Sequence, residues 1–286
     1  MNTTPATTEV LRTDHRRTVT ATWDTRRLDS TDLLPGGAGG LHHHHCGTGP
    51  YDPAVLEAPA PDRSRRIVNE LHRLESSQAD LLLDHLGPLP ADARAVDAGS
   101  GLGGTAFMAH QRWGCSVDGV TISEYQADFA NRQAAERGVA DRVRFHFRTM
   151  LDTGFATGSR QALWTNESTM YVDLDEAFTE FARVLAPGGR YVCITGCSDD
   201  VTGGRSRAVS RIDSHYTCNI HPRSAYFTAL AAHGLVPITV TDLTARTIPY
   251  WELRLRSSLA TGIEPAFLTA YGEGSFHYLL IVADRI

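Results

Sequence analysis

The sequence predicts an α/β fold in which a parallel sheet carries helices on both faces. From residue 87 onward, short strand-like runs alternate with longer segments of helical periodicity. The segment AVDAGSGLGG at 95–104 joins the first of these strands to the first helix through closely spaced glycines. Strands that alternate with helices of this length run parallel and are covered on both faces. The 286 residues suffice for one large domain with a sizeable core.

The chain divides into three parts. Residues 1–20, rich in threonine and charge, are expected to be a disordered lead-in. Residues 21–86 are expected to hold a glycine-rich loop at 32–50 and then a helical segment, because apolar residues recur at helical spacing over 62–86. That spacing predicts one helix or two packed helices. Residues 87–286 hold the sheet.

Within 87–286 the expected elements follow one another in order. Strands are expected at 93–99, 115–122, 142–147, 161–166, 190–196, 235–243 and 275–286, and helices at 103–113, 123–138, 174–185, 222–234 and 251–260. The second of these helices begins at a candidate cap, Ser123, and ends at a glycine. The third, LDEAFTEFARVL, is amphipathic, and APGG behind it is a turn signal.

Composition and charge argue against several classes of protein. A formal charge of −6 disfavours a broad nucleic-acid surface. No apolar run approaches the ~20 residues that span a bilayer, and the first residues lack the apolar core of a signal peptide. Five scattered cysteines, without a C-x-x-C pair, predict free thiols in a reducing cytoplasm. Whether identical chains associate into a homo-oligomer is left open.

The glycines of AVDAGSGLGG predict a nucleotide-binding turn. Gly99, Gly101 and Gly103 allow a tight strand-to-helix turn beside a ligand, where a Cβ would collide. They also fit a nicotinamide-binding Rossmann domain, in which Asp118 would be the acid that binds the ribose. Asp97, two residues before the first glycine, instead favours a cationic ligand such as S-adenosylmethionine, because a carboxylate there repels a pyrophosphate.

Together with GVTISEYQ after the second strand and LAPGGRYV before the fifth, this turn resembles that of the class I, Rossmann-like S-adenosylmethionine-dependent methyltransferases. The resemblance implies S-adenosylmethionine as cofactor at Asp97, Gly99 and Gly101. It implies that Thr121 and Gln126, with Ser123 between them, hold the ribose and amino-acid parts. It places three residues close to the adenine: Met150, Leu151 and Asp152.

Asn166 and Glu167 follow the fourth expected strand, at the edge of the sheet where ligands bind in such folds. Glu167 is flanked by Trp164, Met170 and Tyr171, and a charge among such side chains is costly unless a cation or a donor pairs with it. A transient carbocation would be a suitable partner. Alternatively, Glu167 is a structural acid that caps the following helix.

Longer blocks carry a more specific resemblance. The segments ELHRLESSQADLLLDHLG, NESTMYVDL, ITGC, CNIH, PYWELR and SSLATGIE, with the HHHH run, resemble bacterial geranyl diphosphate C-methyltransferases and relatives acting on other prenyl diphosphates, from about residue 40 to 286. These enzymes methylate an alkene carbon in terpenoid biosynthesis. The resemblance therefore implies a helical lid at 21–86 and a methyltransferase core at 87–286 with acceptor-site insertions.

The family's reaction assigns roles to aromatic and acidic residues. The alkene attacks the methyl group, and a base then deprotonates the resulting carbocation; the matching base is Glu167, with Asn166 beside it. Tyr216 matches an aromatic that stabilises the cation. Tyr171, Tyr250 and Trp251 are weaker candidates for this role, and each is equally well interpreted as simple core.

The run LHHHHCGTG at 41–49 is interpreted through the same resemblance. Its internal position argues against a purification tag, and adjacent histidines project in different directions, which disfavours a structural zinc site. A loop over the active site is expected, in which His43, His44 and His45 donate to diphosphate oxygens or shape the pocket beside Cys46. Packing or solvent exposure is the alternative.

The diphosphate implies Mg²⁺, held mainly by the diphosphate itself and by water. Five further residues are candidates for contacts to the diphosphate: Arg211, His215, Asn219, His221 and Arg223.

The chain departs from the geranyl-specific pattern at four positions. His42 and Cys46 replace tyrosines, and Ser198 and Ala208 replace tryptophans. Fewer aromatics would weaken cation stabilisation and widen the cavity, so farnesyl or isopentenyl diphosphate are candidate acceptors beside geranyl diphosphate. Two rivals remain: a methyltransferase of a sterol-like or phenolic acceptor, which would not need magnesium, and a NAD-binding Rossmann protein.

Overall fold

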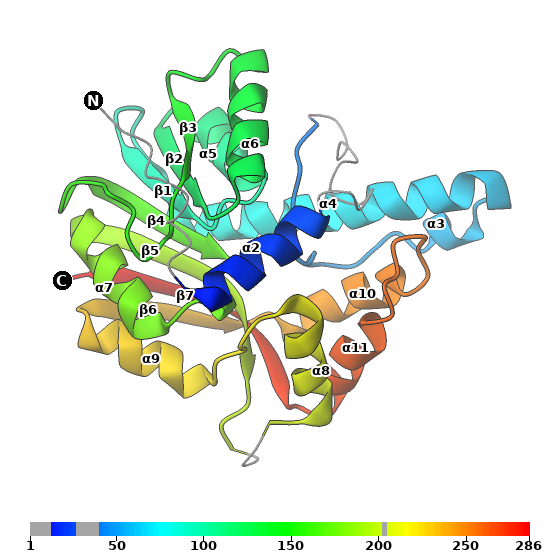
Figure 1. Cartoon of the computed structure of the whole chain (residues 1–286). Coiled ribbons are helices and arrows are strands. Elements are labelled where there is room, and N and C mark those ends of the chain that lie inside the picture. Colours follow the sequence, from blue (N-terminus) through cyan, green and yellow to red (C-terminus); the bar gives the residue numbers. More distant parts are fainter. Residues whose placement is uncertain (1–12, 27–39, 202–204) are drawn as a thin grey trace.

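A seven-stranded sheet forms the centre of the computed structural model, which describes residues 13–26, 40–201 and 205–286. The strands lie in the order β3-β2-β1-β4-β5-β7-β6 (Figure 1). Their bounds are β1 (Arg94–Ala98), β2 (Ser116–Thr121), β3 (Val143–Phe147), β4 (Arg160–Asn166), β5 (Leu185–Ser198), β6 (Leu235–Asp242) and β7 (Phe276–Arg285). All seven expected strands are present.

The expected parallel sheet is present in β1 to β5, and β7 departs from it. Strands β1 to β5 pair in parallel, whereas β7 lies antiparallel to both β5 and β6. The reason is connectivity: β7 enters the sheet from the helical segment after β6 and fills the place between β5 and β6, so it runs against both neighbours.

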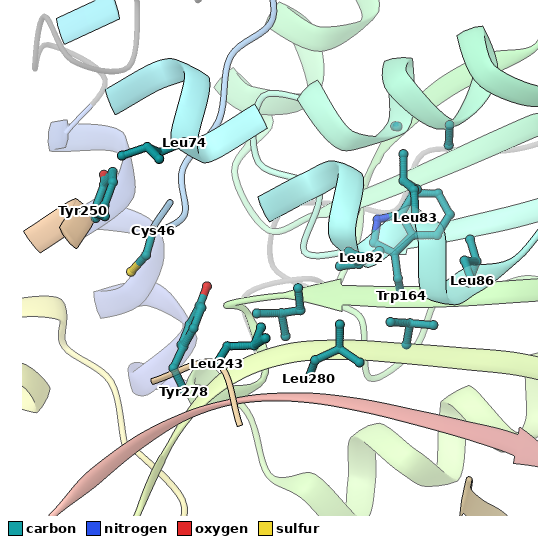
Figure 2. Close-up of a cluster of buried hydrophobic side chains, with 14 of the residues drawn as sticks. Cys46, Leu74, Leu82, Leu83, Leu86, Trp164, Leu243, Tyr250, Tyr278 and Leu280 are labelled. Atoms are coloured by element: carbon teal, nitrogen blue, oxygen red, sulfur yellow. The ribbon is translucent and has the colours of Figure 1, made fainter. Parts of the chain in front are cut away.

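Helices cover both faces of the sheet, as expected. On one face α4 (Ala60–Leu86), α5 (Gly104–Trp113) and α6 (Glu124–Glu136) share a hydrophobic cluster with Ala95, Ala162 and Trp164. On the other face α7 (Leu174–Val184) and α9 (Arg223–Ala232) pack against the alternate strand residues Val96 and Leu163. Figure 2 shows leucines of α4 beside Trp164. Burial of each such leucine side chain contributes about 1.5–3 kcal/mol to the stability of the fold.

The segment predicted as one or two helices at 62–86 is a single helix, α4, which packs on β4, β5 and β7. Residues 14–20, expected within a disordered lead-in, instead begin helix α2 (Asp14–Arg26), while residues 1–12 lie outside the described residues. Figure 1 shows α2, in dark blue, lying across the body of the molecule. The Thr20 hydroxyl anchors it by donating to the Ile122 carbonyl at 3.1 Å.

Several helical elements were not predicted. They are α3 (Ala54–Glu57), the 3₁₀ turn η1 (Thr169–Tyr171), α8 (Arg207–Tyr216) and α11 (Glu264–Gly272). The helix expected at 251–260 is α10 (Thr244–Arg254), which begins earlier and contains Pro249. Figure 1 shows α8, α10 and α11 grouped together, away from α7 and α9. No helix among the described residues is long and apolar enough to cross a membrane.

Candidate active site

Two adjoining cavities lie beyond the carboxyl ends of β1 and β4. The first cavity measures about 120 Å³ and the second about 300 Å³. Residues 41–49 are called the histidine loop. The two linings share residues from α2, from the histidine loop and from the segment after β4: Trp23, His43, His44, His45, Glu167 and Tyr171. A group bound in the first cavity therefore lies next to one bound in the second.

The glycine turn forms one wall of the first cavity. Gly99 and Gly101 line it with φ angles of 87° and 52°, a region that glycine adopts without strain. A Cβ on Gly99 would lie 2.4 Å from the Ser168 Cβ, and one on Gly103 would lie 2.4 Å from the Phe145 ring. These glycines are therefore required by close packing as well as by the turn, as the sequence predicted.

Asp97 lines the same cavity and is only 3% exposed. Burial raises the pKa of its carboxyl group to about 8, and the nearby Trp164 side chain offsets this only partly. A cationic group in the first cavity would thus find an acid that is destabilised as a carboxylate by the lack of a counter-charge.

The other expected cofactor residues divide into two groups. Thr121 and Gln126 line the first cavity and are joined by a 2.7 Å hydrogen bond from the threonine hydroxyl, and Met150 also lines it. Ser123 does not: its hydroxyl accepts from the Gln126 backbone and caps α6, as expected from the sequence, and donates to Asp24. Leu151 lies beside the cavity without lining it.

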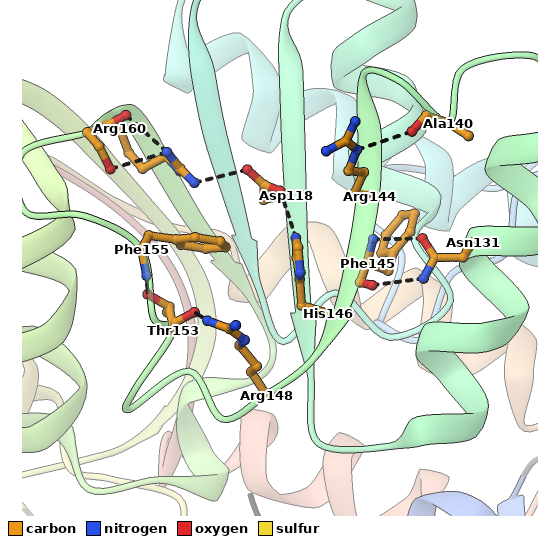
Figure 3. Close-up of polar contacts among 11 residues, drawn as sticks. Asp118, Asn131, Ala140, Arg144, Phe145, His146, Arg148, Thr153, Phe155 and Arg160 are labelled. Atoms are coloured by element: carbon orange, nitrogen blue, oxygen red, sulfur yellow. Dashed lines mark hydrogen bonds and ion pairs between the residues drawn. The ribbon is translucent and has the colours of Figure 1, made fainter. Parts of the chain in front are cut away.

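Asp118, the candidate ribose acid of a nicotinamide-binding domain, has other partners. Figure 3 shows it between His146 and Arg160, at 2.7 Å and 3.0 Å. It lines neither cavity. The structure therefore contradicts the role that a NAD-binding protein would require of it.

The histidine loop lies on the glycine turn and lines both cavities. A Cβ on Gly104 would lie 2.3 Å from the His42 carbonyl oxygen, which shows how closely the two segments pack. His43 is buried, and burial, together with the neighbouring histidines, holds its pKa well below the ordinary value. Its ring contacts His45 at 3.2 Å and Ser76 at 3.4 Å. A neutral His43 shapes the pocket.

Glu167 lies where the cavities meet, directly after β4. Its φ of 51° is a left-handed conformation that few non-glycine residues adopt. The carboxylate accepts hydrogen bonds from the Cys46 backbone N–H at 2.7 Å, from the Cys46 thiol at 3.4 Å and from the Tyr278 hydroxyl. Burial and the neighbouring Glu167 raise the pKa of the Cys46 thiol, so the thiol keeps its proton.

The alternative reading of Glu167 as a helix cap is wrong. The next α-helix, α7, is capped by Asp173, whose carboxylate accepts from the Asp175 and Glu176 backbones. No side chain caps the intervening 3₁₀ turn η1. The carboxylate of Glu167 is directed instead to the loop of Cys46 and to Tyr278.

Aromatic side chains line much of the second cavity. Trp251 stacks on Phe267 with ring centroids 3.7 Å apart, and Tyr171, Tyr216 and Tyr250 also line the space. Arg254 is a cation of this wall, 3.3 Å from Glu264. Although burial alone lowers the pKa of Arg254, the nearby tyrosines and acids, Tyr250 foremost, hold it above its usual value.

Not every expected acceptor residue reaches the cavities. His215 alone of the five candidates for diphosphate contacts lines one. Arg211 donates to the Gly262 carbonyl, His221 contacts the Val172 carbonyl, and Arg223 lies 4.0 Å from Asp200. Ala208 is buried in α8, one turn before Ile212, and lines neither cavity, whereas Ile212, His215 and Tyr216 of the same helix line the second.

Four lining or supporting residues were missed: Glu75, Gln78, Arg254 and Tyr278. Arg254 belongs to the quoted block PYWELR and follows Tyr250 by one helical turn. It could therefore have been predicted to lie on the same face of the helix as Tyr250. Gln78 is a polar residue on the apolar stripe of α4, which is also visible in the sequence. Nothing in the alternation of β7 distinguishes Tyr278 from a core aromatic.

Comparisons with known proteins agree with this geometry. A family model described as a methyltransferase domain matches residues 95–189. The chain is 58% identical over 261 residues to the geranyl diphosphate 2-C-methyltransferase of Saccharopolyspora erythraea, which covers 91% of this chain and 92% of that protein. It is 52% identical over 256 residues to the Streptomyces coelicolor enzyme of the same name, across 89% and 88% of the two chains.

Solved structures extend the match to three dimensions. The S. coelicolor geranyl diphosphate C-methyltransferase, in complex with Mg²⁺, geranyl-S-thiolodiphosphate and S-adenosyl-L-homocysteine, superposes with a TM-score of 0.94 at 49% identity. The match covers 99% of this chain and 100% of that one. These findings confirm the class I fold and the resemblance seen in the sequence: the chain belongs to the geranyl diphosphate 2-C-methyltransferase family of S-adenosylmethionine-dependent methyltransferases.

Proposed function

We propose that the chain transfers a methyl group from S-adenosylmethionine to an alkene carbon of a prenyl diphosphate, with geranyl diphosphate as the preferred acceptor. The observation that carries this proposal is the place of Glu167, which lines both cavities. A carboxylate base thus stands between a pocket suited to a cationic donor and a larger pocket walled by aromatics. The relatives' activity supports the same reaction and a place in terpenoid biosynthesis.

The first cavity fits S-adenosylmethionine. Asp97 offers a buried carboxyl group that gains a counter-charge when an ammonium or sulfonium binds. Thr121 and Gln126 form a polar pair for the ribose and amino-acid parts, and Met150 supplies an apolar surface for the adenine. The bound cofactor supplies the electrophilic methyl group; the residues around it bind it and orient it toward the second cavity.

The second cavity fits a prenyl diphosphate. Arg254 stays cationic: its Nε forms an ion pair with Glu264 at 3.3 Å without a hydrogen bond, and the guanidinium in the cavity wall is a charge that a diphosphate oxygen can pair with. His215 is a second donor in the same wall. No group of three or more His, Cys, Asp or Glu within the described residues could hold a metal ion. A Mg²⁺ would then be held mainly by the diphosphate and water.

Glu167 removes the proton that restores the alkene. Once the new carbon–carbon bond forms, the adjacent carbon is cationic, and the carboxylate stabilises that charge and accepts the proton. Tyr216 presents an aromatic side chain to the same cavity, and a desolvated ring contributes about 2 kcal/mol to a bound cation.

The four departures from the geranyl-specific pattern change the cavities less than the sequence suggested, and this favours geranyl diphosphate as the acceptor. Ser198 and Ala208 line neither cavity, so the absence of tryptophan at these positions does not widen the described pocket directly. His42 lines the first cavity, edge-on to Phe129. Cys46 is the departure that lines the second cavity, beside the proposed base.

A competition assay tests this function. Isopentenyl, dimethylallyl, geranyl and farnesyl diphosphates are offered together with S-adenosylmethionine and Mg²⁺, and dephosphorylated products are analysed by mass spectrometry for one added methylene unit. Methylated geraniol as the main product supports the proposal, and it should disappear when EDTA removes the metal. No methylated prenol, with S-adenosylhomocysteine still binding, would refute the acceptor.

A further inference from the structure

We propose that Gln78 is a positioning residue for this reaction: through Asn166 and Tyr278 it fixes the Glu167 carboxylate so that Oε2, and not Oε1, accepts the proton. The inference rests on the proposed function and deepens it. Gln78 lies within the quoted block ELHRLESSQADLLLDHLG, but no role was assigned to it, and Tyr278 lies outside the quoted motifs.

Gln78 is an unusual residue for its position. It is 0% exposed and lies one helical turn from both Leu74 and Leu82, on the stripe of α4 that faces the sheet. A buried amide on an apolar stripe is costly unless its donors and acceptor are satisfied. An apolar residue would pack at this place without that requirement, so the amide calls for an explanation in terms of its partners.

The partners of Gln78 form a closed pair with Asn166. The Gln78 Nε2 donates to the Asn166 Oδ1 at 2.7 Å, and the Asn166 Nδ2 donates back to the Gln78 Oε1 at 2.9 Å. Neither amide can turn over alone without losing both hydrogen bonds, and a joint turn would set the Gln78 Oε1 against the Tyr278 hydroxyl oxygen, whose proton is donated to Glu167. The Gln78 Nε2 is therefore held as a donor.

That orientation agrees with the direction of the next hydrogen bond, which ends on the carboxylate acceptor of Glu167. The Gln78 Nε2 also donates to the Tyr278 hydroxyl oxygen at 2.8 Å, so the Tyr278 proton is directed elsewhere, to the Oε1 of Glu167. Burial, with the nearby Glu167, raises the pKa of Tyr278 well above its ordinary value, so the phenol retains this proton. Figure 2 shows the Tyr278 hydroxyl directed toward the Cys46 loop.

The two oxygens of Glu167 are consequently unequal. Oε1 accepts from the Tyr278 hydroxyl and from the Cys46 N–H, two strong donors. Among the described residues Oε2 accepts only from the Cys46 thiol, a weak donor that itself lines the second cavity. In the proton transfer, the C–H bond breaks, its electron pair becomes the new alkene bond, and the proton passes to the freer oxygen, Oε2.

The test compares four full-length chains: wild type, Gln78→Leu, Tyr278→Phe and Tyr191→Phe. Tyr191→Phe is the matched control, because its hydroxyl makes a buried 2.6 Å hydrogen bond to Thr165 and it lines neither cavity. Each chain is assayed with geranyl diphosphate and with the same acceptor deuterated at the carbon that gains the methyl group. The kinetic isotope effect on kcat reports how far proton removal limits turnover.

We expect kcat to fall about 10- to 100-fold in Gln78→Leu and Tyr278→Phe, with both KM values essentially unchanged and the isotope effect larger than in wild type. A loss of stability alone would lower the active fraction without moving the isotope effect. Tyr191→Phe should keep the isotope effect of wild type.

An unchanged isotope effect in Gln78→Leu, or behaviour matching Tyr191→Phe, would overturn the inference. If Gln78→Leu does not fold, Tyr278→Phe decides alone, and wild-type kcat and isotope effect there overturn it equally. Failure of the proposed function is a separate outcome, since wild type itself would then form no methylated prenyl product.

Discussion

At the scale of single residues, the site depends on two carboxyl groups in contrasting surroundings. Glu167 accepts three hydrogen bonds at the junction of the cavities, whereas Asp97 is buried behind the glycine turn with a raised pKa. The first surroundings hold the carboxylate between hydrogen-bond donors, and the second hold an acid that gains a counter-charge when a cationic ligand binds. The two groups therefore respond differently to the same substitution of carboxylate by amide.

Glu167→Gln should lose about 10²- to 10⁴-fold in kcat, because a neutral amide neither attracts the cation nor accepts its proton. The amide keeps the shape of the side chain, so S-adenosylhomocysteine should bind with wild-type affinity in a calorimeter. Methylated prenol formation, measured with geranyl diphosphate, is the readout. Turnover equal to that of wild type would remove Glu167 from the mechanism.

Asp97→Asn should stabilise the ligand-free chain in alkaline solution. The folded-state pKa of about 8 lies above the ordinary carboxyl value, so the folded chain binds the proton more tightly and loses stability as the pH rises from about 4 to 8. The asparagine cannot ionise and escapes this loss. Its Tm should therefore exceed that of wild type by at least about 2 °C at pH 8.5.

The control for this variant is the same measurement at pH 5, where the two chains should differ much less. S-adenosylhomocysteine should at the same time bind Asp97→Asn more weakly than wild type at pH 8.5. A Tm difference that is equal at both pH values would contradict the assigned cause.

At the scale of elements, the glycine turn lets the start of α5 approach the sheet and the cofactor. Gly99→Ala must place a Cβ 2.4 Å from Ser168 at a positive φ, whereas Gly138→Ala adopts a positive φ with no atom within 4 Å. The second change should cost about 1–2 kcal/mol of unfolding free energy. The first should cost about 1–3 kcal/mol more, and should also weaken S-adenosylhomocysteine binding.

Chemical denaturation and calorimetry of both variants check this prediction. Equal stability losses would mean that backbone strain, and not the contact with Ser168, accounts for the effect of Gly99→Ala. Weakened cofactor binding in Gly138→Ala would contradict the placing of the cofactor at Gly99, because Gly138 lies at the far end of α6.

The elements themselves were predictable to different degrees. The strands and the helices that cross between them carry clear periodicity, because each buries one face against the sheet. Helix α2 has no such pattern: it is mostly polar, and its tertiary contacts lie with distant segments such as Ile122. Helix α10 continues through Pro249, a residue that disfavours a helix interior, and so begins before the expected helix at 251–260. Helix α8 has an amphipathic pattern, with Ala208, Val209 and Ile212 buried on one face, that was not recognised in the sequence, whereas α11 has no comparable pattern.

At the scale of the whole molecule, the site joins segments that are far apart in the chain. The motifs located the glycine turn, Glu167 and the histidine loop, and these do meet around the two cavities. The support for Glu167 comes from α4 and from β7, separated from it by 89 and 111 residues. Such pairings depend on how helices and strands pack, which local patterns do not encode, so the contacts of Gln78 and Tyr278 with the site could not be predicted, although Gln78 stands out as a polar residue on the apolar stripe of α4.

The shared lining of the cavities predicts coupled binding of the two substrates. Trp23 of α2 contacts both His44 and Tyr171 edge-on, and all three line both cavities. A first ligand that orders this shared wall leaves less ordering for the second. S-adenosylhomocysteine at about 100 times its Kd should add about 2.7 kcal/mol of stability. Geranyl diphosphate with Mg²⁺ should then raise the Tm of the S-adenosylhomocysteine-bound chain by more than it raises the Tm of the chain without S-adenosylhomocysteine.

Thermal melts of the chain alone, with each ligand and with both, measure this coupling. NAD serves as the control, because Asp118 is already paired with His146 and Arg160 and cannot serve a nicotinamide cofactor's ribose. NAD should leave Tm unchanged. A combined shift equal to the sum of the separate shifts would mean that the shared wall is already ordered before either ligand binds, and that each cavity fills independently of the other.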